Sequence, residues 1–119
     1  MKYMLLIYLD EKALSETERE QCYVKSAQVA REIHASGHYV DASPLHPTTT
    51  ATSIRMRDGK KVVTDGPFAE TREQLGGYYL INASNLDEAI SIAERIPGAR
   101  WGTVEIRPVM EIGGLPGQA

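Results

Sequence analysis

The order of the periodic segments constrains the fold of this chain more than any other feature. Residues 2–9 form an apolar run without strict alternation, which is typical of a central strand covered on both faces. Ser15 and Glu18 then have the spacing of a capping box, and a helical pattern continues from there for about 20 residues, until Gly37. We therefore expect a buried strand followed at once by a long amphipathic helix.

Further strands and a second helix complete the order. Asp58-Gly59 has the composition of a tight hairpin turn between two strand-like runs. Pro97-Gly98 is expected to end the second helix. The remaining predicted strands cover residues 38–43, 50–56, 61–64, 77–83 and 102–110, and the apolar stripe of the second helix consists of Leu86, Ala89, Ile90 and Ala93.

This order of strand, helix, group of strands, helix and strand indicates an α+β protein. It predicts an antiparallel sheet of the ferredoxin-like type, with two helices on one face and an added β-hairpin. The other face of the sheet lacks helices, although residues 2–9 present apolar side chains to it as well. A second subunit is the simplest cover for that face, so we expect a homodimer with two-fold symmetry.

Composition argues against several classes of partner. The net charge is −3 and no basic stripe is present, which disfavours a nucleic-acid partner. The N-terminal apolar run stops at Asp10-Glu11 without a cleavage site, and no segment approaches the length of a membrane span. The single cysteine, Cys22, cannot form an internal disulfide. We therefore expect a cytoplasmic protein without membrane association.

The stretch from Asp65 to Tyr79 is the most specified part of the chain, and loops placed by a rigid scaffold often carry function. Asp65 has two interpretations of similar weight. It closes an Asx turn or caps a helical turn that begins at Pro67, or it is a general acid or base beside Phe68. Apolar surroundings would raise the pKa of its carboxyl group, which suits proton transfer near neutral pH.

Other residues of this stretch are weaker candidates. Glu70 is a second candidate catalytic acid, and pairing with Arg72 or solvation is the favoured alternative. Phe68 is a candidate for substrate contact, although a role as an anchor of the loop is favoured. Gly76 and Gly77 precede a strand instead of a helix, so they predict a bulge or a close backbone approach and not a phosphate site.

The strand over residues 102–110 separates polar from apolar side chains. Its polar face includes Glu105 and Arg107. An ordinary solvated face is the favoured interpretation, but in a dimer cleft Arg107 could hold a substrate carboxylate with two hydrogen bonds. Tyr8 and Tyr78 could add hydroxyl groups to the same cleft, or pack as strand tyrosines usually do.

Histidine and cysteine give no metal site in this sequence. His34 and His38 are four residues apart, but the first helix is expected to end between them and no third ligand is evident. His46 is a loop residue and a candidate for substrate binding. Cys22 lies on the apolar stripe of the helix and is expected to pack. No cofactor motif is present, so we expect neither a cofactor nor a metal.

The chain resembles the YCII-related superfamily, specifically its DGPF-domain branch. The resemblance covers a domain of residues 1–110, and residues 111–119 are expected to form a flexible tail. The residues that carry it are the opening run 1–8, the hairpin Arg57-Asp58-Gly59, the stretch 63–81 and the end from Ile96 to Val109.

This resemblance implies a dimeric α+β barrel and a family without a settled activity. Better-described members are regarded as enzymes because of a His–Asp pair in a cleft. The signature stretch here contains no histidine, and only His46 lies near it in sequence. Some DGPF-type relatives are associated with extracytoplasmic-function sigma factors, which makes such a factor a candidate partner.

Two functional hypotheses follow. The first is a homodimer with a cleft for a small polar or aromatic metabolite, and a cofactor-free proton transfer, isomerisation or lyase step. Asp65 would then be the acid or base and Arg107 the substrate anchor. The second is a non-catalytic regulatory module that binds another protein, such as a sigma factor, through the loop or a helix face.

Overall fold

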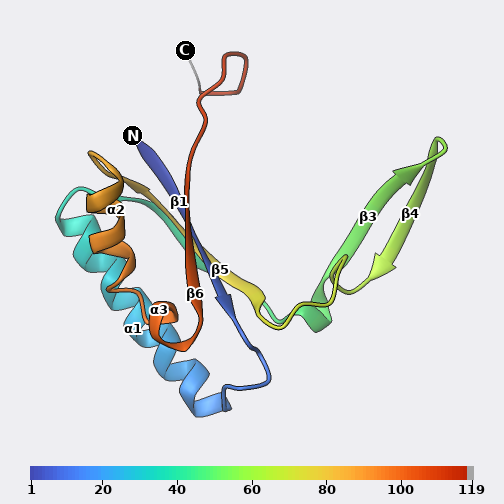
Figure 1. Ribbon diagram of the computed structural model, residues 1–119, viewed down its shortest axis with the longest axis horizontal. Coiled ribbons are helices and arrows are strands. Elements are labelled where there is room, and N and C mark those ends of the chain that lie inside the picture. Colours follow the sequence, from blue (N-terminus) through green and yellow to red (C-terminus); the bar gives the residue numbers. More distant parts are fainter. Residues whose placement is uncertain (118–119) are drawn as a thin grey trace.

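The computed structural model describes residues 1–117 and shows an α+β protein with helices on one side of a four-stranded sheet and a separate hairpin (Figure 1). Of the predicted tail, residues 118–119 lie outside the described part, and residues 111–117 are exposed without helix or strand. The strands are β1 Lys2–Leu9, β2 Tyr39–Pro44, β3 Thr52–Arg57, β4 Lys60–Asp65, β5 Gln74–Asn82 and β6 Thr103–Pro108, and the helices are α1 Glu16–Ala35, α2 Leu86–Ala93 and α3 Gly98–Trp101, with a 3-10 turn, η1, at Thr48–Thr50.

The sheet has the predicted ferredoxin-like topology. Its strands lie in the order β2-β5-β1-β6, and every neighbouring pair is antiparallel. The hairpin of β3 and β4 is inserted in the chain between β2 and β5 and forms a sheet of its own. The first strand is therefore central, as its apolar composition predicted.

The first helix begins and ends as the sequence predicts. The hydroxyl of Ser15 accepts a hydrogen bond from the backbone of Glu18, whose carboxylate accepts one from the backbone of Ser15. At the other end, Gly37 has a φ of 84°, a conformation that costs glycine little. The face of α1 that is buried carries Cys22, Val29 and Ile33.

The core lies between the sheet and the helices. Alternate residues of β1 and β5 point into it, because side chains along a strand alternate between the two faces of the sheet. The largest fully buried side chains come from four different elements or their ends: Leu5, Ile33, Ile81 and Ile96.

The second helix differs from its predicted pattern. Leu86 and Ile90, which the predicted stripe includes, are about half exposed, whereas Ile92 is buried. The buried residues 89, 92, 93 and 96 have helical spacing too, and this second stripe is the one that faces the sheet. Helix α2 ends at Ala93, before the Pro97-Gly98 step that was expected to end it, and this step instead begins the short helix α3, because proline is tolerated at a helix start.

The hairpin of residues 52–65, called the arm below, projects away from the body of the molecule (Figure 1). Its turn is the predicted one: Asp58 and Gly59 both have positive φ, at 52° and 73°. The radius of gyration is 16.2 Å, whereas a compact domain of this length has about 13.5 Å. Asp65 ends β4, so it belongs to the arm and not to the loop that the sequence suggested.

Replacing Ile33 by Ala tests this core. The change removes three carbon atoms from a fully buried site between α1 and the sheet, and we expect the free energy of unfolding to fall by about 2–5 kcal/mol. Val24 is on the same helix and 68% exposed, so Val24→Ala should change stability by less than about 0.5 kcal/mol. Urea denaturation followed by circular dichroism measures both, and equal losses would contradict the described packing.

Candidate functional site

The helix-free side of the four-stranded sheet, called the open face below, carries an apolar centre. Met4 and Leu6 of β1 alternate with core residues and therefore point to this side. Leu80 of β5 lies opposite Met4 in the antiparallel register. All three are only partly buried in the single chain. This centre is the surface that the sequence predicted to need a cover.

One flank of the open face carries the predicted tyrosine, glutamate and arginine. The hydroxyl of Tyr8 donates to Glu105 at 3.4 Å, and the other oxygen of Glu105 lies 3.9 Å from the guanidinium of Arg107. The Arg107 side chain is 67% exposed. Glu105 and Arg107 thus lie beside the apolar centre, opposite Leu6 and Met4 in the register. Arg107 can donate to a ligand carboxylate, since its ionic partner among residues 1–117 lies 3.9 Å away.

The opposite flank contains a second tyrosine–carboxylate pair, of which the sequence predicted only the tyrosine. The hydroxyl of Tyr78 donates to the carboxylate of Asp41 at 2.8 Å. This bond raises the pKa of Tyr78 above the ordinary tyrosine value of 10.0, because the carboxylate favours the protonated hydroxyl and opposes a second negative charge. Tyr78 was a predicted site residue, but Asp41 was not. Its position opposite Leu80 in the pairing of β2 with β5 could not be read before the register was known.

The other candidate residues lie apart from the open face: Asp65, Phe68, Glu70 and His46. Asp65 is on the arm, which shares no strand pairing with the four-stranded sheet, and its carboxylate accepts no hydrogen bond within residues 1–117. Phe68 is 76% exposed, and Glu70 and His46 are exposed as well. Within one chain, Asp65 and Arg107 therefore do not share a cleft.

A pocket of about 390 Å³ lies on the other side of the sheet, between α1 and the strands β2 and β5. It is called the α1 pocket below. Its wall is predominantly apolar and small, which leaves room between helix and sheet. The residues that line it from α1 are Cys22, Tyr23, Ser26, Ala27, Ala30 and Arg31, and those from the strands include Leu9, Tyr39, Ala42, Pro44, Gly77 and Tyr79.

A few polar groups border this apolar wall. The hydroxyl of Tyr79 donates to the backbone carbonyl of Ser26 at 2.6 Å, which joins β5 to α1. Burial raises the pKa of Tyr79 and of the Cys22 thiol, because both would lose hydration of their charged forms. Cys22 is thus a protonated packing residue at neutral pH, as the sequence predicted, and it lies at the pocket.

Two glycines shape the strand side of the pocket. The register between β1 and β5 shifts at Gly76, which confirms the predicted bulge. A Cβ at Gly77 would lie only 2.9 Å from the Ser43 carbonyl oxygen, so only glycine allows β2 to approach β5 there. The sequence indicated the two glycines but not the pocket, whose other signal is the pair Ala27 and Ala30 on one side of α1.

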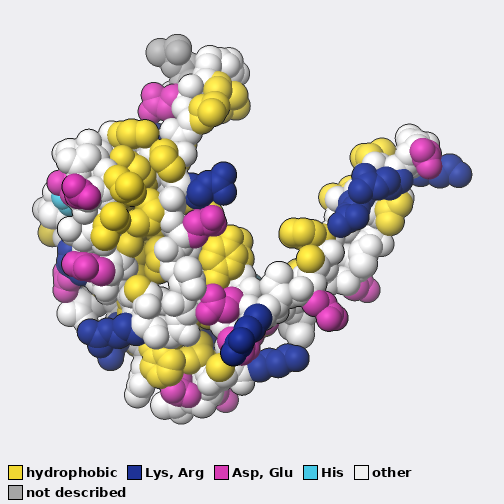
Figure 2. Space-filling view, in the orientation of Figure 1, with side chains coloured by type: hydrophobic (Ala, Val, Ile, Leu, Met, Phe, Trp, Pro, Cys, Tyr) yellow, Lys and Arg dark blue, Asp and Glu magenta, His cyan; other side chains and the backbone are white. Residues whose placement is uncertain are grey.

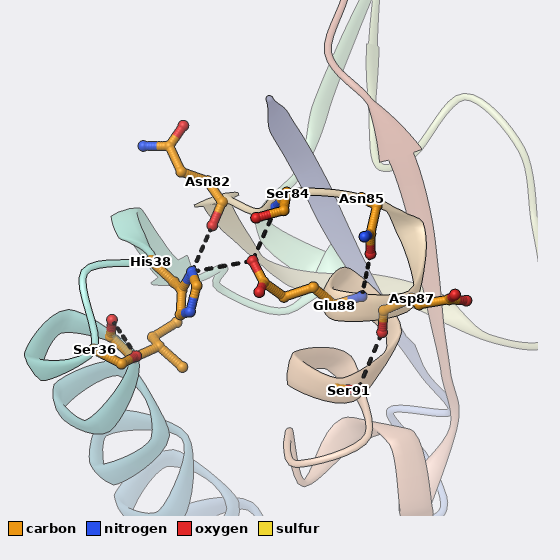
Figure 3. Close-up of polar contacts among 9 residues, drawn as sticks. Ser36, His38, Asn82, Ser84, Asn85, Asp87, Glu88 and Ser91 are labelled. Carbon is orange, nitrogen blue, oxygen red and sulfur yellow. Dashed lines mark hydrogen bonds and ion pairs between the residues drawn. The ribbon is translucent and has the colours of Figure 1, made fainter.

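A histidine–carboxylate contact occurs at the far end of α1, where the sequence predicted only a helix-terminal histidine (Figure 3). The Nδ1 atom of His38 lies 2.9 Å from the Asn82 carbonyl oxygen and 3.6 Å from Glu88. Since both neighbours are acceptors, Nδ1 carries the proton. Glu88 also accepts from the Ser84 backbone, and Asn85 caps α2. The cluster therefore fastens the start of α2 to the end of β5.

Residues 1–117 contain no group of three or more His, Cys, Asp or Glu side chains that could hold a metal ion. Within the same residues, no helix is long and apolar enough to cross a membrane.

Replacing Asp41 by Asn tests the Tyr78 pair. Because the charged carboxylate raises the pKa of Tyr78, the neutral amide should move that pKa down, toward the value of an ordinary tyrosine. Glu105→Gln is the matched control, since Glu105 contacts Tyr8 on the other flank. The titration of isotope-labelled tyrosines by NMR measures both, and a Tyr78 pKa that stays in place in the Asn variant would contradict the contact.

Comparison with known proteins adds two findings. The model of the YCII-related domain matches residues 1–113. An uncharacterized protein of Rhizobium meliloti (strain 1021) is 40% identical over 114 residues, which cover 92% of each chain.

Proposed function

Because the chain belongs to the family of YCII-related domains, we propose that it is a cytoplasmic, homodimeric protein that binds a small molecule in the α1 pocket. The observation that carries this proposal is the pocket itself. Its volume of about 390 Å³ lies within the range of small-molecule sites, roughly 300–1,000 Å³.

The lining of the pocket favours a ligand with a compact apolar body, such as an aromatic ring. Alanine, glycine and proline make much of the wall, and they allow a flat molecule to lie between α1 and the sheet. Tyr23 and Tyr39 supply aromatic surface. Arg31 supplies a cationic group on the helix side, which favours a ligand with one carboxylate.

The open face supports the homodimer. Met4, Leu6 and Leu80 form an apolar centre that the helices of the same chain do not cover. A second copy would bury this centre and would remove the flanking polar groups from bulk water. A two-fold arrangement is favoured, because it buries the same surface on both copies.

A ligand screen, repeated on a variant whose pocket is filled by a larger side chain, tests the binding proposal. A ligand that binds only the native state raises the melting temperature, and the rise grows with the logarithm of the ratio of free ligand concentration to dissociation constant. We expect hits from a library of small aromatic acids, and we expect Ala27→Phe to abolish these shifts because the added ring occupies the pocket from the exposed side of α1. Thermal-shift measurement followed by calorimetric titration of the hits measures the effect.

Val24→Phe is the matched control. Val24 is an exposed residue of α1 that does not line the pocket, so the same added ring should leave the ligand shifts unchanged. Loss of the shifts in both variants, or in neither, would contradict the α1 pocket as the ligand site.

A proton-transfer reaction is a separate proposal, because it would use a second site on the open face and not the α1 pocket. Asp65 would be the acid or base, Glu70 its alternative, and Arg107 the anchor of a substrate carboxylate. The support is that Asp65 has no hydrogen-bonded partner within the described chain, and that Arg107 is largely exposed beside the Tyr8–Glu105 pair. No cofactor is invoked, because acid–base chemistry needs none.

Asp65→Asn tests this reaction once a substrate is known. We expect turnover to fall by at least about a hundredfold, which is the usual contribution of a general acid or base. The fold of the single chain should be retained, as circular dichroism would show, since the Asp65 side chain is exposed there. Turnover that survives the change would remove Asp65 from the mechanism.

A protein-binding module is the second candidate function. Phe68 is 76% exposed in the loop that follows the arm, and an exposed aromatic side chain beside other apolar residues is a feature of contact surfaces. An extracytoplasmic-function sigma factor is the partner to test first, by co-purification with the wild type and with Phe68→Ser.

A further inference from the structure

The arm is an element without support from its own chain. A two-stranded hairpin is marginally stable alone and needs a further strand or a packing surface. The arm pairs with no other strand of the described residues, and every residue of β4 is exposed. Its large apolar side chains are exposed too: Ile54 by 63%, Met56 by 59% and Val63 by 54%. Such a surface is expected to have a cover.

The two faces of the arm differ in chemistry. The antiparallel register places Ile54 opposite Val63 and Met56 opposite Lys61, so these four side chains share one face. Asp65 is on that face as well, at the base of the arm. The other face carries the remaining cations and Val62, from the residue pairs Ser53–Thr64, Arg55–Val62 and Arg57–Lys60.

Charge separates the arm from the rest of the molecule. Residues 52–65 contain four of the 13 basic residues but only two of the 16 acidic residues, so the arm has a charge of +2 and the remainder −5. Figure 2 shows dark-blue side chains gathered at the outer end of the arm, and a wide concave space between it and the body. The arm and the body of another copy are therefore opposite in net charge, although Arg55, Arg57 and Lys60 lie on the face of the arm away from Ile54 and Val63.

Hydrogen bonds close the base of the arm and attach the segment before it to the body of the molecule. The backbone of Gly66 donates to the Ala51 carbonyl at 2.7 Å, and the Ser53 hydroxyl donates to the Gly66 carbonyl at 2.8 Å. The carboxylate of Glu11 binds both the backbone and the hydroxyl of Thr48 in the segment just before the arm. These bonds favour an arm whose direction is set before any partner arrives.

We propose that the arm is exchanged between two copies, so that its apolar face packs on the open face of the partner. This inference rests on the proposed homodimer and specifies how its cover is made. Ile54, Met56 and Val63 would lie on the apolar centre of Met4, Leu6 and Leu80. Both surfaces are apolar and at least partly exposed in the single chain, and a two-fold axis would cover both at once.

The charged groups around the two surfaces match in this arrangement. The apolar face of the arm carries Asp65 and Lys61, and the open face carries Arg107 and Glu105. We assign Asp65 to Arg107 of the opposite copy, and Lys61 to Glu105. The carboxylate and the guanidinium that one chain keeps on separate sheets thus belong to one site, which two copies build together.

Aspartate substitutions on the two faces of the arm test the exchange. Ile54→Asp places a charge on the apolar face, and the dissociation constant of the dimer should rise by at least about tenfold, the cost of 1.4 kcal/mol or more that buried contacts carry. Val62→Asp places the same charge on the opposite face and should leave the constant within about twofold, as for a residue at a solvated rim. Sedimentation equilibrium of the full chain measures both.

Charge reversal tests the assigned pair. Asp65→Arg and Arg107→Asp should each weaken the dimer, because each places like charges together at two symmetric contacts. The double variant should restore dimerisation to within about threefold of the wild type, since the pair is re-formed with opposite signs. An equimolar mixture of the two single variants should form a heterodimer more readily than either forms a homodimer.

The outcomes distinguish failure of the arm exchange from failure of the proposed homodimer. A wild-type chain that stays monomeric at high micromolar concentration overturns both the proposed homodimer and the exchange. A stable dimer that Ile54→Asp and Val62→Asp weaken equally, or not at all, overturns the exchange and leaves the homodimer standing. Circular dichroism of each variant checks that its fold is retained, which is expected because Ile54, Val62 and Asp65 are exposed.

Discussion

The packing of β1 between two neighbours and against α1 is the constraint on which the rest of the structure depends. Leu5 is fully buried on the helix side, and Ile33 of α1 is buried with it. Alternation along the strand then obliges Met4 and Leu6 to point to the other side. The chain cannot bury one set without exposing the other, so an exposed apolar centre is a direct consequence of this core. The dimer that we propose would bury this exposed apolar centre.

Much of the fold could be predicted because local signals agreed with the tertiary structure. The capping box at Ser15, the positive-φ residue Gly37 and the Asp58-Gly59 turn act over a few residues, so their chemistry is complete in the sequence. The stripe of α2 was predicted less well. Leu86, Ile90 and Ile92 offered two overlapping helical faces, and only contact with the sheet decides between them.

The candidate site was predicted in its parts but not in its assembly. Tyr8, Glu105 and Arg107 do lie together, because alternation on two strands is readable from sequence. Asp41 was missed, since its place beside Tyr78 depends on the register of β2 with β5. The α1 pocket was missed for a similar reason. The volume of the pocket depends on the position of α1 relative to the sheet, which local sequence patterns do not give. Small residues such as Ala27 and Ala30 also occur in many helices that line no pocket.

The arm also bears on how the chain avoids aggregation. Each of its strands is an edge strand, with one row of backbone groups in a ladder and the other row free to pair with any extended segment. Lysine and arginine on such edges oppose this pairing, since stacked ribbons would bring like charges together. Arg55 and Arg57 lie on one strand of the ribbon, and Lys60 and Lys61 begin the other. Repulsion between these cations would keep a newly synthesised monomer soluble until it dimerises.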